Sequence, residues 1–293
     1  MKIVQSFWSK PFLKKEDKSK YCRKSGGFLE KKYFYFSTAL SCLQLCKYYQ
    51  KVELITDDFG MSLLVDKLKL PYTSVKLDLN ILKNIHQDLW AMGKLKAYEL
   101  QDEPFIHVDN DVYIWEKFPD KIENAQLISQ NKEINFKVFN EPLEQIYSFF
   151  EYIPHFMKCP KEELIMYNAG IFGGNDFSFF KKYVNHSYEF VNRNLNYLEK
   201  IDKGLFNCFY EQYVFHRLVD SEKRHVECLL GVLDNNHKGL AEFAGVPTRT
   251  KFIHLLGFYK TFFHVSERLE SRFRMDYPEY YYRIIELLKK GEI

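Results

Sequence analysis

Short apolar runs alternate with helical segments through the first 110 residues, and this alternation restricts the fold more than any other feature. Strands are predicted at residues 2–8, 52–56, 74–77 and 105–109. Helices are predicted between them at residues 33–50, 59–69 and 88–100. Strands and helices that alternate with short links are typical of an α/β fold, with a mixed, mostly parallel central sheet flanked by helices.

The fourth predicted strand ends on two carboxylates, because Phe105-Ile106-His107-Val108 is followed by Asp109-Asn110-Asp111. Ligands bind outside the carboxyl ends of the strands in such sheets. Two carboxylates at this spacing aim oxygen ligands at one point, which suits Mg²⁺ or Mn²⁺ held together with substrate phosphates. The motif predicts an enzyme that handles a nucleotide diphosphate, although short Asp-x-Asp strings also occur in solvated turns.

The second half of the chain is less regular. An apolar strand broken by small residues is predicted over residues 164–174, and helices near 176–198 and 207–220. Strands follow near 224–230 and 251–254, and the tail from Ser266 is predicted to be helical. Glycines inside the first of these strands indicate the close approach of a ligand or of another backbone.

Three patterns in this half add to the paired carboxylates: Asn168-Ala169-Gly170, Glu211-Gln212 and His254-x-x-Gly257-x-x-Lys260. Each has a structural alternative, namely a turn hydrogen bond, a solvated helix face, or a structural histidine followed by a surface lysine. Two carboxylates and one imidazole would give an O,O,N ligand set, which favours Mn²⁺. Gly257 would allow backbone N–H groups to approach phosphate oxygens, and Lys260 would supply a point charge.

In this order the four patterns resemble those of the retaining glycosyltransferases of family 8, the group of glycogenin and the bacterial lipopolysaccharide galactosyltransferases. The resemblance implies a GT-A fold (the nucleotide-diphospho-sugar transferase fold), a UDP-sugar donor and Mn²⁺ or Mg²⁺ as cofactor. It places a GT-A catalytic domain at residues 1–262, with a C-terminal helical extension at 263–293 packed on it.

The resemblance also assigns site residues. The metal ligands would be Asp109, Asp111 and His254. The catalytic residues would be Glu211 and Gln212, on the reacting face of the donor sugar, with Asn168. The donor would be bound by Ser6, Lys94, Asn110, Ala169, Gly257 and Lys260, and Lys96 fits the pattern of the family as well as Lys94 does.

The implied reaction is the transfer of a hexose from a nucleotide diphosphate sugar to an acceptor hydroxyl, with retention at the anomeric carbon. Glu211 stands where the family has Asp, and Thr261-Phe262 where it has Pro-Trp, which leaves the donor base and sugar open. A nucleotidyltransferase is one alternative, although Ser6–Pro11 lacks the Gly-rich loop of that class. A non-catalytic GT-A-like protein that binds nucleotide sugars is another.

The amino-acid composition limits which binding partners and which cellular location are expected. With 42 basic and 39 acidic residues the net charge is +3, so no nucleic-acid partner is expected. The six cysteines show no C-x-x-C pair, and Cys42 and Cys46 are expected to pack as thiols. No signal peptide and no apolar run of about 20 residues is seen, so a cytoplasmic location is expected.

The acceptor is left open as a glycan, a lipid-linked glycan or a protein. The basic segment 10–32 and the aromatic tail are consistent with a solvated loop and ordinary packing. They leave open a peripheral contact with the inner face of the membrane and a homodimer.

Overall fold

The computed structural model describes residues 1–14, 24–158, 163–234 and 240–293. Residues 15–23 of the basic segment 10–32 therefore lie outside the described residues. The chain divides into two compact units. The central unit comprises Met1, Asp88–His107 and Phe118–Asn236, and the terminal unit comprises Lys2–Gln87, Val108–Lys117 and His237–Ile293.

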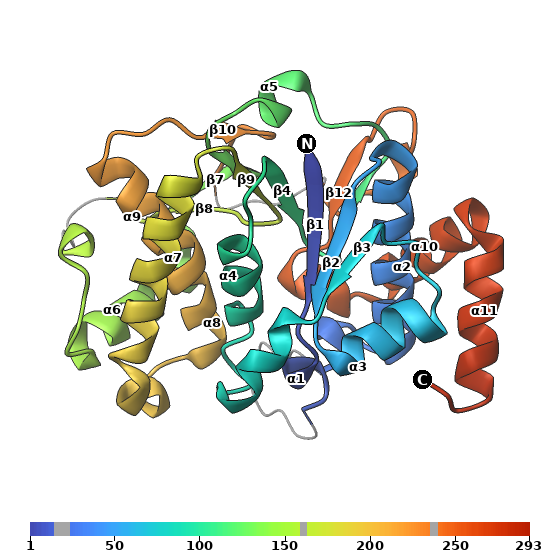
Figure 1. The fold of residues 1–293 in the computed structure, drawn as a ribbon, viewed down its shortest axis with the longest axis horizontal. Helices are drawn as coiled ribbons and strands as arrows, with labels where there is room; N and C mark the ends of the chain where they lie inside the picture. The colour runs from blue at the N-terminus through green and yellow to red at the C-terminus, as the bar shows by residue number, and fades with distance from the viewer. Residues whose placement is uncertain (15–23, 159–162, 235–239) are drawn as a thin grey trace. The chain divides into compact units, whose positions relative to one another are not determined.

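The terminal unit contains the predicted alternation of strands and helices (Figure 1). Strands β1 (Lys2–Phe7), β2 (Val52–Thr56) and β3 (Ser74–Lys76) are parallel and adjacent in that order. Between them run α1 (Ser9–Phe12), η1 (Lys24–Gly27), α2 (Lys31–Tyr48), α3 (Asp58–Gly60) and η2 (Met61–Lys67), and η3 (Asp78–Asn84) follows. The segment predicted to be helical at 59–69 is mostly a π-helix, η2.

A second pair of strands completes the terminal unit. Strand β5 (Val112–Ile114) pairs antiparallel with β12 (Phe252–His254), so that His254 lies opposite Val112. Two short 3₁₀ helices flank β12, η8 (Phe243–Gly245) before it and η9 (Gly257–Thr261) after it. The tail forms α10 (Phe263–Asp276) and α11 (Pro278–Lys289), and both pack on α2. The domain boundary predicted at residue 262 stays a prediction.

The central unit holds two groups of strands. In one group the order is β10 (Glu227–Cys228), β6 (Ile128–Ser129), β9 (Ile171–Gly174) and β4 (Phe105–Val108). In the other it is β11 (Val232–Asp234), β7 (Lys132–Ile134) and β8 (Ile165–Tyr167). The strand predicted at 164–174, broken by small residues, is therefore two separate strands. The residues form β8 and β9 in different groups, because Asn168 makes a turn in which its Oδ1 accepts a hydrogen bond from the Gly170 N–H.

Helices surround these strands: α4 (Met92–Glu99), α5 (Asp120–Glu123), α6 (Asn140–Phe149), α7 (Phe177–Asn192), α8 (Lys203–Cys208) and α9 (Val214–Ser221). Shorter turns are η4 (Lys137–Phe139), η5 (His155–Met157), η6 (Leu195–Lys200) and the π-helix η7 (Phe209–Tyr213). The predicted fold class, mixed α/β with a mostly parallel sheet flanked by helices, is confirmed.

Close backbone approach explains one glycine of β9. A Cβ placed on Gly173 would lie 2.2 Å from the carbonyl oxygen of Phe105 in β4, so only glycine fits between these strands.

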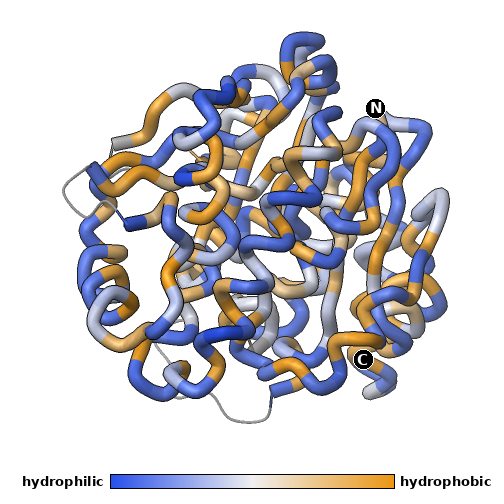
Figure 2. The backbone as a smooth tube through the Cα atoms, turned by 60° about the vertical axis from the view of Figure 1, so that its left-hand side comes forward, coloured by the Kyte–Doolittle hydropathy of each residue, from blue (hydrophilic) through white to orange (hydrophobic). Residues whose placement is uncertain are grey.

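Along the tube in Figure 2 hydrophobic stretches are short and broken by hydrophilic ones, and none of the described helices is long and apolar enough to cross a membrane. Cys42 and Cys46 are free thiols.

The core of the terminal unit predicts a strong effect of one substitution. Phe36 of α2 is fully buried, with its ring 5.5 Å from that of Phe273 and 5.3 Å from that of Tyr281. Phe36→Ala should lower the free energy of unfolding by about 3–5 kcal/mol in urea denaturation, because it leaves a cavity between α2 and the two tail helices. Tyr282→Ala, at a side chain that is 61% exposed, should change it by less than about 0.5 kcal/mol. Equal effects would contradict this packing.

Candidate functional site

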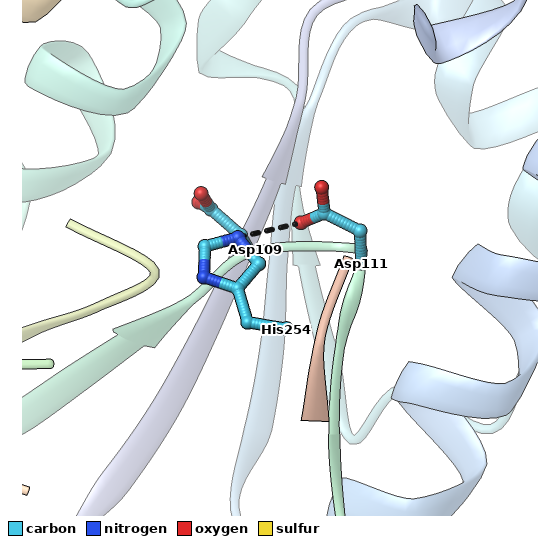
Figure 3. A group of neighbouring side chains, drawn as sticks. All are labelled: Asp109, Asp111 and His254. Atoms are coloured by element: carbon cyan, nitrogen blue, oxygen red, sulfur yellow. Dashed lines mark ion pairs between the residues drawn. The ribbon is translucent and has the colours of Figure 1, made fainter. Parts of the chain in front are cut away.

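Three potential metal ligands meet in the terminal unit (Figure 3). Asp109 and Asp111 lie in the turn between β4 and β5, which closes with a hydrogen bond from the Val112 N–H to the Asp109 carbonyl. His254 is the last residue of β12, and the β5–β12 pairing brings it beside this turn. One ligand atom from each of the three residues lies within 4.8 Å of the others.

The geometry suits a divalent cation. The His254 Nε2 lies 3.5 Å from Asp111 Oδ1. Ligands at about 2.1 Å from one Mg²⁺ or Mn²⁺ ion stand roughly 3–4.2 Å apart, so only small side-chain adjustments are needed. Asp111 and His254 are both buried. Two carboxylates with one imidazole form the donor set that the sequence predicts, and these residues fit a metal ion.

Lys260 lies against the same carboxylate. Its ammonium group forms an ion pair with Asp111 Oδ2, lies 3.4 Å from the carbonyl oxygen of Gly26, and stands 5.4 Å from the centre of the Phe28 ring. Burial alone would raise the pKa of the Asp111 carboxyl, but Lys260 and then His254 hold this pKa well below its usual range. Asp111 is therefore ionised at neutral pH, the form that binds a metal.

Hydrogen bonds from α2, and one that the turn donates to β1, hold the turn in place. Ser37 Oγ donates to the Asn110 carbonyl at 2.9 Å, and Ser41 Oγ donates to the Asp109 carbonyl at 3.3 Å. Asn110 Nδ2 donates to the carbonyl of Ser6 at 2.9 Å, which joins two of the predicted donor-binding residues. Gln5 Nε2 donates to Ser41 Oγ at 2.9 Å. No pattern in the sequence singles out Gln5, Ser37 and Ser41 as residues that hold the turn in place.

Gly257 begins η9 with a φ of +45°, a left-handed conformation that favours glycine. Among the residues that the structure describes, no heavy atom other than those of its chain neighbours and of the η9 backbone lies within 4 Å of the place where a Cβ would stand. Its conformation, rather than a crowded neighbour, therefore requires glycine. The turn lets the chain leave β12 and place Lys260 at Asp111.

A cavity of about 800 Å³ opens near the carboxyl ends of β1 and β2. Its lining includes Trp8, Ser9, Lys10, Asp57 and Asp58. Asp57 Oδ2 accepts hydrogen bonds from the Ser9 N–H at 2.8 Å and from Ser9 Oγ at 2.7 Å. This edge of the sheet is where α/β folds bind ligands, and the Asp57-Asp58 pair that ends the second predicted strand lies in it.

Other predicted site residues meet in the central unit. The Lys94 ammonium of α4 lies 2.8 Å from Glu211 Oε1 and donates to the Ala169 carbonyl at 3.1 Å. Lys96, the alternative to Lys94, pairs instead with Glu99 at 2.9 Å. The structure therefore brings Lys94, and not Lys96, to Glu211 and Ala169.

Two tyrosines hold Glu211 in place within η7. Tyr98 donates its hydroxyl to Glu211 Oε1 at 2.8 Å, and Tyr183 donates to the Glu211 carbonyl at 2.7 Å. The Tyr98 ring also contacts His107 edge-on, with ring centres 5.2 Å apart. Burial, aided by the charge of Lys94, lowers the pKa of His107 well below its usual value, so this imidazole is neutral at neutral pH. The sequence pattern marked neither tyrosine as a partner of Glu211, and it did not mark His107 as a partner of Tyr98.

The remaining two predicted catalytic residues are buried in the central unit as well. Asn168 Nδ2 donates to Glu133 Oε1 at 2.7 Å, and Gln212 follows Glu211 in η7. Asn168 therefore has a structural role in its turn whatever else it contacts.

Comparisons with known proteins give weak structural likenesses. A search of curated proteins found no match. The glycosyltransferase GlyE of Streptococcus pneumoniae TIGR4 is 10% identical with a TM-score of 0.43, over 99% of this chain and 64% of that one. The chain thus spans less than two thirds of that structure. The galactosyltransferase LgtC, solved with donor and acceptor sugar analogues, is 13% identical with a TM-score of 0.37, over 72% of this chain and 70% of that one.

Both TM-scores are below 0.5, so the function has to be inferred from the site residues themselves. A family model gives a clear result, because it matches residues 1–287, nearly the whole sequence. Its description is that of a family of unknown function, and the chain belongs to this family, DUF6734.

Proposed function

We propose that this protein is a metal-dependent glycosyltransferase of the GT-A type. It moves a hexose from a nucleotide diphosphate sugar, with UDP-sugars as the expected donors, to the hydroxyl of an acceptor. The observation that carries the proposal is the cluster of Asp109, Asp111 and His254 with the Lys260 ammonium on the Asp111 carboxylate. Two carboxylates, an imidazole and a buried cation suit a diphosphate bound together with a divalent cation.

Asp109, Asp111 and His254 would hold the metal, with Mn²⁺ favoured by the imidazole. When bound, the ion would supply Lewis-acid stabilisation of the negative charge on the leaving diphosphate. The hydrogen bonds from Ser37 and Ser41 to the carbonyls of Asn110 and Asp109 keep the turn in place before any ligand arrives. Such preorganisation avoids a cost of rearrangement during the reaction.

Lys260 supplies positive charge from the protein itself. Its burial and its contact with the Gly26 carbonyl fix the ammonium beside Asp111. As the bond between the sugar and the diphosphate breaks, negative charge grows on the leaving oxygen, and a fixed ammonium nearby stabilises that charge. Gly257 and the turn that it begins would contribute backbone N–H groups to the same diphosphate.

In the proposed reaction the bond from the anomeric carbon to the diphosphate oxygen breaks, and a bond from this carbon to the acceptor oxygen forms on the same face. The proton of the acceptor hydroxyl passes to the leaving phosphate oxygen. Glu211 would stabilise positive charge at the anomeric carbon, with Gln212, Asn168 and Ala169 lining the sugar. The acceptor would be a glycan, a lipid-linked glycan or a protein.

Lys94 and Tyr98 would support Glu211 in that role. Both contact Glu211 Oε1 at 2.8 Å, so the carboxylate has little rotational freedom. A buried carboxylate with no compensating charge would be costly, and the Lys94 ammonium provides that charge. Ser6 and Asn110, linked by one hydrogen bond, would contact the nucleoside part of the donor.

Metal binding gives the first test. Asp109→Asn should weaken Mn²⁺ binding in the presence of UDP by about 100-fold or more, since even outer-shell partners contribute about 10- to 100-fold. Calorimetric titration of the folded variant measures this change. Asp102→Asn, at an exposed carboxylate in a loop, is the matched control and should leave the affinity unchanged. A wild-type protein that binds no Mn²⁺ with millimolar UDP would refute the proposed site.

Turnover gives the second test. A panel of nucleotide sugars incubated with the full chain should show Mn²⁺-dependent release of nucleoside diphosphate from one donor, because water replaces a missing acceptor at a slow rate. Product analysis by chromatography identifies the nucleotide. Release of pyrophosphate would instead indicate a nucleotidyltransferase, and tight binding of the donor without any release would indicate a non-catalytic protein.

Glu211 gives the third test. Glu211→Gln retains the shape of the side chain and an oxygen for the Tyr98 hydroxyl, and should lower kcat roughly 100-fold because a charge is lost at the reacting carbon. UDP affinity should change by less than about twofold, as expected for a residue that acts in the transition state. Glu199→Gln, at an exposed carboxylate paired with Lys203, is the control. A Glu211→Gln variant with an unaltered melting temperature and near-normal kcat would remove Glu211 from the chemistry.

A further inference from the structure

A second cavity, of about 460 Å³, lies in the terminal unit. This volume falls in the range of small-molecule sites. The cavity is at the other end of the β5–β12 pair from the metal ligands. Trp115, which follows β5, and Lys251, which precedes β12, both line it, whereas Asp111 precedes β5 and His254 ends β12. Three-residue strands span about 10 Å, so this cavity is separate from the proposed metal centre.

The lining has an excess of positive charge. Lys47, Lys251 and Arg272 face one acidic residue, Asp276. Arg272 and Asp276 form an ion pair. The excess of positive charge therefore comes from the two lysines. Lys251 lies 3.8 Å from Glu116, but that carboxylate is 61% exposed, so the pair is a weak surface contact. The cavity therefore favours a ligand that carries a negative charge.

One residue of the lining carries a buried amide. Gln44 lines the cavity and is 1% exposed, and its Nε2 donates to Asp276 Oδ2 at 3.2 Å. The orientation of the amide is fixed because the Asp276 carboxylate, in its ion pair with Arg272, only accepts hydrogen bonds. Gln44 Oε1 is buried and accepts no hydrogen bond within the described part of the chain. A carboxylate or phosphate group brings no donor for this oxygen, whereas a hydroxyl group does.

Aromatic side chains form the walls. Trp115, Tyr48 and Tyr277 line the cavity. The Trp115 indole donates from Nε1 to Asp276 Oδ2 at 3.3 Å, and Tyr48 donates its hydroxyl to the Trp115 carbonyl at 2.7 Å. These bonds hold the walls in place without a ligand. Rigid aromatic surfaces with a polar edge suit a ring that is apolar on its faces and polar at its rim.

We propose that this cavity binds an acidic saccharide, a sugar ring that carries a carboxylate together with hydroxyl groups. The lysines would meet the carboxylate, Gln44 Oε1 would accept from a hydroxyl, and the aromatic side chains would pack on the faces of the ring. The inference is independent of the proposed glycosyl transfer, because no lining residue belongs to the proposed metal or donor site.

The test uses the full chain without nucleotide or metal, titrated by calorimetry with D-glucuronate and N-acetylneuraminate. At least one of these acids should bind saturably and about tenfold more tightly than methyl glucoside. A variant with Lys47→Gln and Lys251→Gln should bind it about tenfold more weakly. The matched control, with Lys137→Gln and Lys181→Gln at exposed positions of the central unit, should bind like the wild type.

Gln44→Met separates a saccharide site from a simple anion site. It removes the unsatisfied oxygen at similar volume, and should weaken binding of the sugar acid while leaving any binding of inorganic sulfate unchanged. The proposal is overturned if neither acid binds at about 10 mM, if sulfate competes as well as the sugar acid, or if UMP binds more tightly than either acid. It is also overturned if the two lysine substitutions change nothing. Mn²⁺ and UDP titrations of the same variants report on the other site separately.

Discussion

The antiparallel pairing of β5 with β12 is the contact on which the candidate site depends. Asp109 and Ile114 are only five positions apart, but His254 comes from a distant part of the sequence and reaches the carboxylates because it lies opposite Val112. The same pairing has the Leu255 N–H donate to the Asp111 carbonyl at 3.0 Å. The chain then turns at Gly257 and places Lys260 on Asp111. A shift of one residue in this register would turn His254 to the other face of the pair.

Buried polar residues of α2 hold the turn that carries Asp109 and Asp111 in place. An ordinary surface helix buries one stripe, but α2 is buried continuously from Tyr33 to Leu45. Hydroxyl groups inside such a helix need partners, because an unsatisfied buried group costs about 1–3 kcal/mol. Ser37 and Ser41 find these partners in the carbonyls of Asn110 and Asp109. The buried hydroxyl groups of α2 and the carbonyl groups of the metal-ligand turn thus supply each other's hydrogen-bond partners.

Sequence reasoning recovered the parts of the molecule that have a long or repeated pattern. The bounds of β2 were predicted at residues 52–56, and the cluster of Asp109, Asp111 and His254 forms as expected. Strands of two or three residues such as β6 and β10 show no periodicity, so the sequence could not mark them. The apolar run at 164–174 predicts one interrupted strand rather than two strands, because its hydrophobicity hides the Asn168 turn. Ser37 and Ser41 were missed because α2, buried on all sides, has no polar face that would single them out.

The division of the chain into units has a consequence for how the protein forms. The terminal unit is built from three separate stretches of sequence, and the last of them begins only at His237. During synthesis, Asp109 and Asp111 emerge long before His254 and Lys260. The Asp111 carboxylate therefore cannot be buried with its ion-pair partner, the Lys260 ammonium, until much later. Contacts between residues so far apart in sequence slow folding. The metal centre can therefore be complete only after the residues up to Lys260 have left the ribosome, and its formation would be a late step in the folding of that unit.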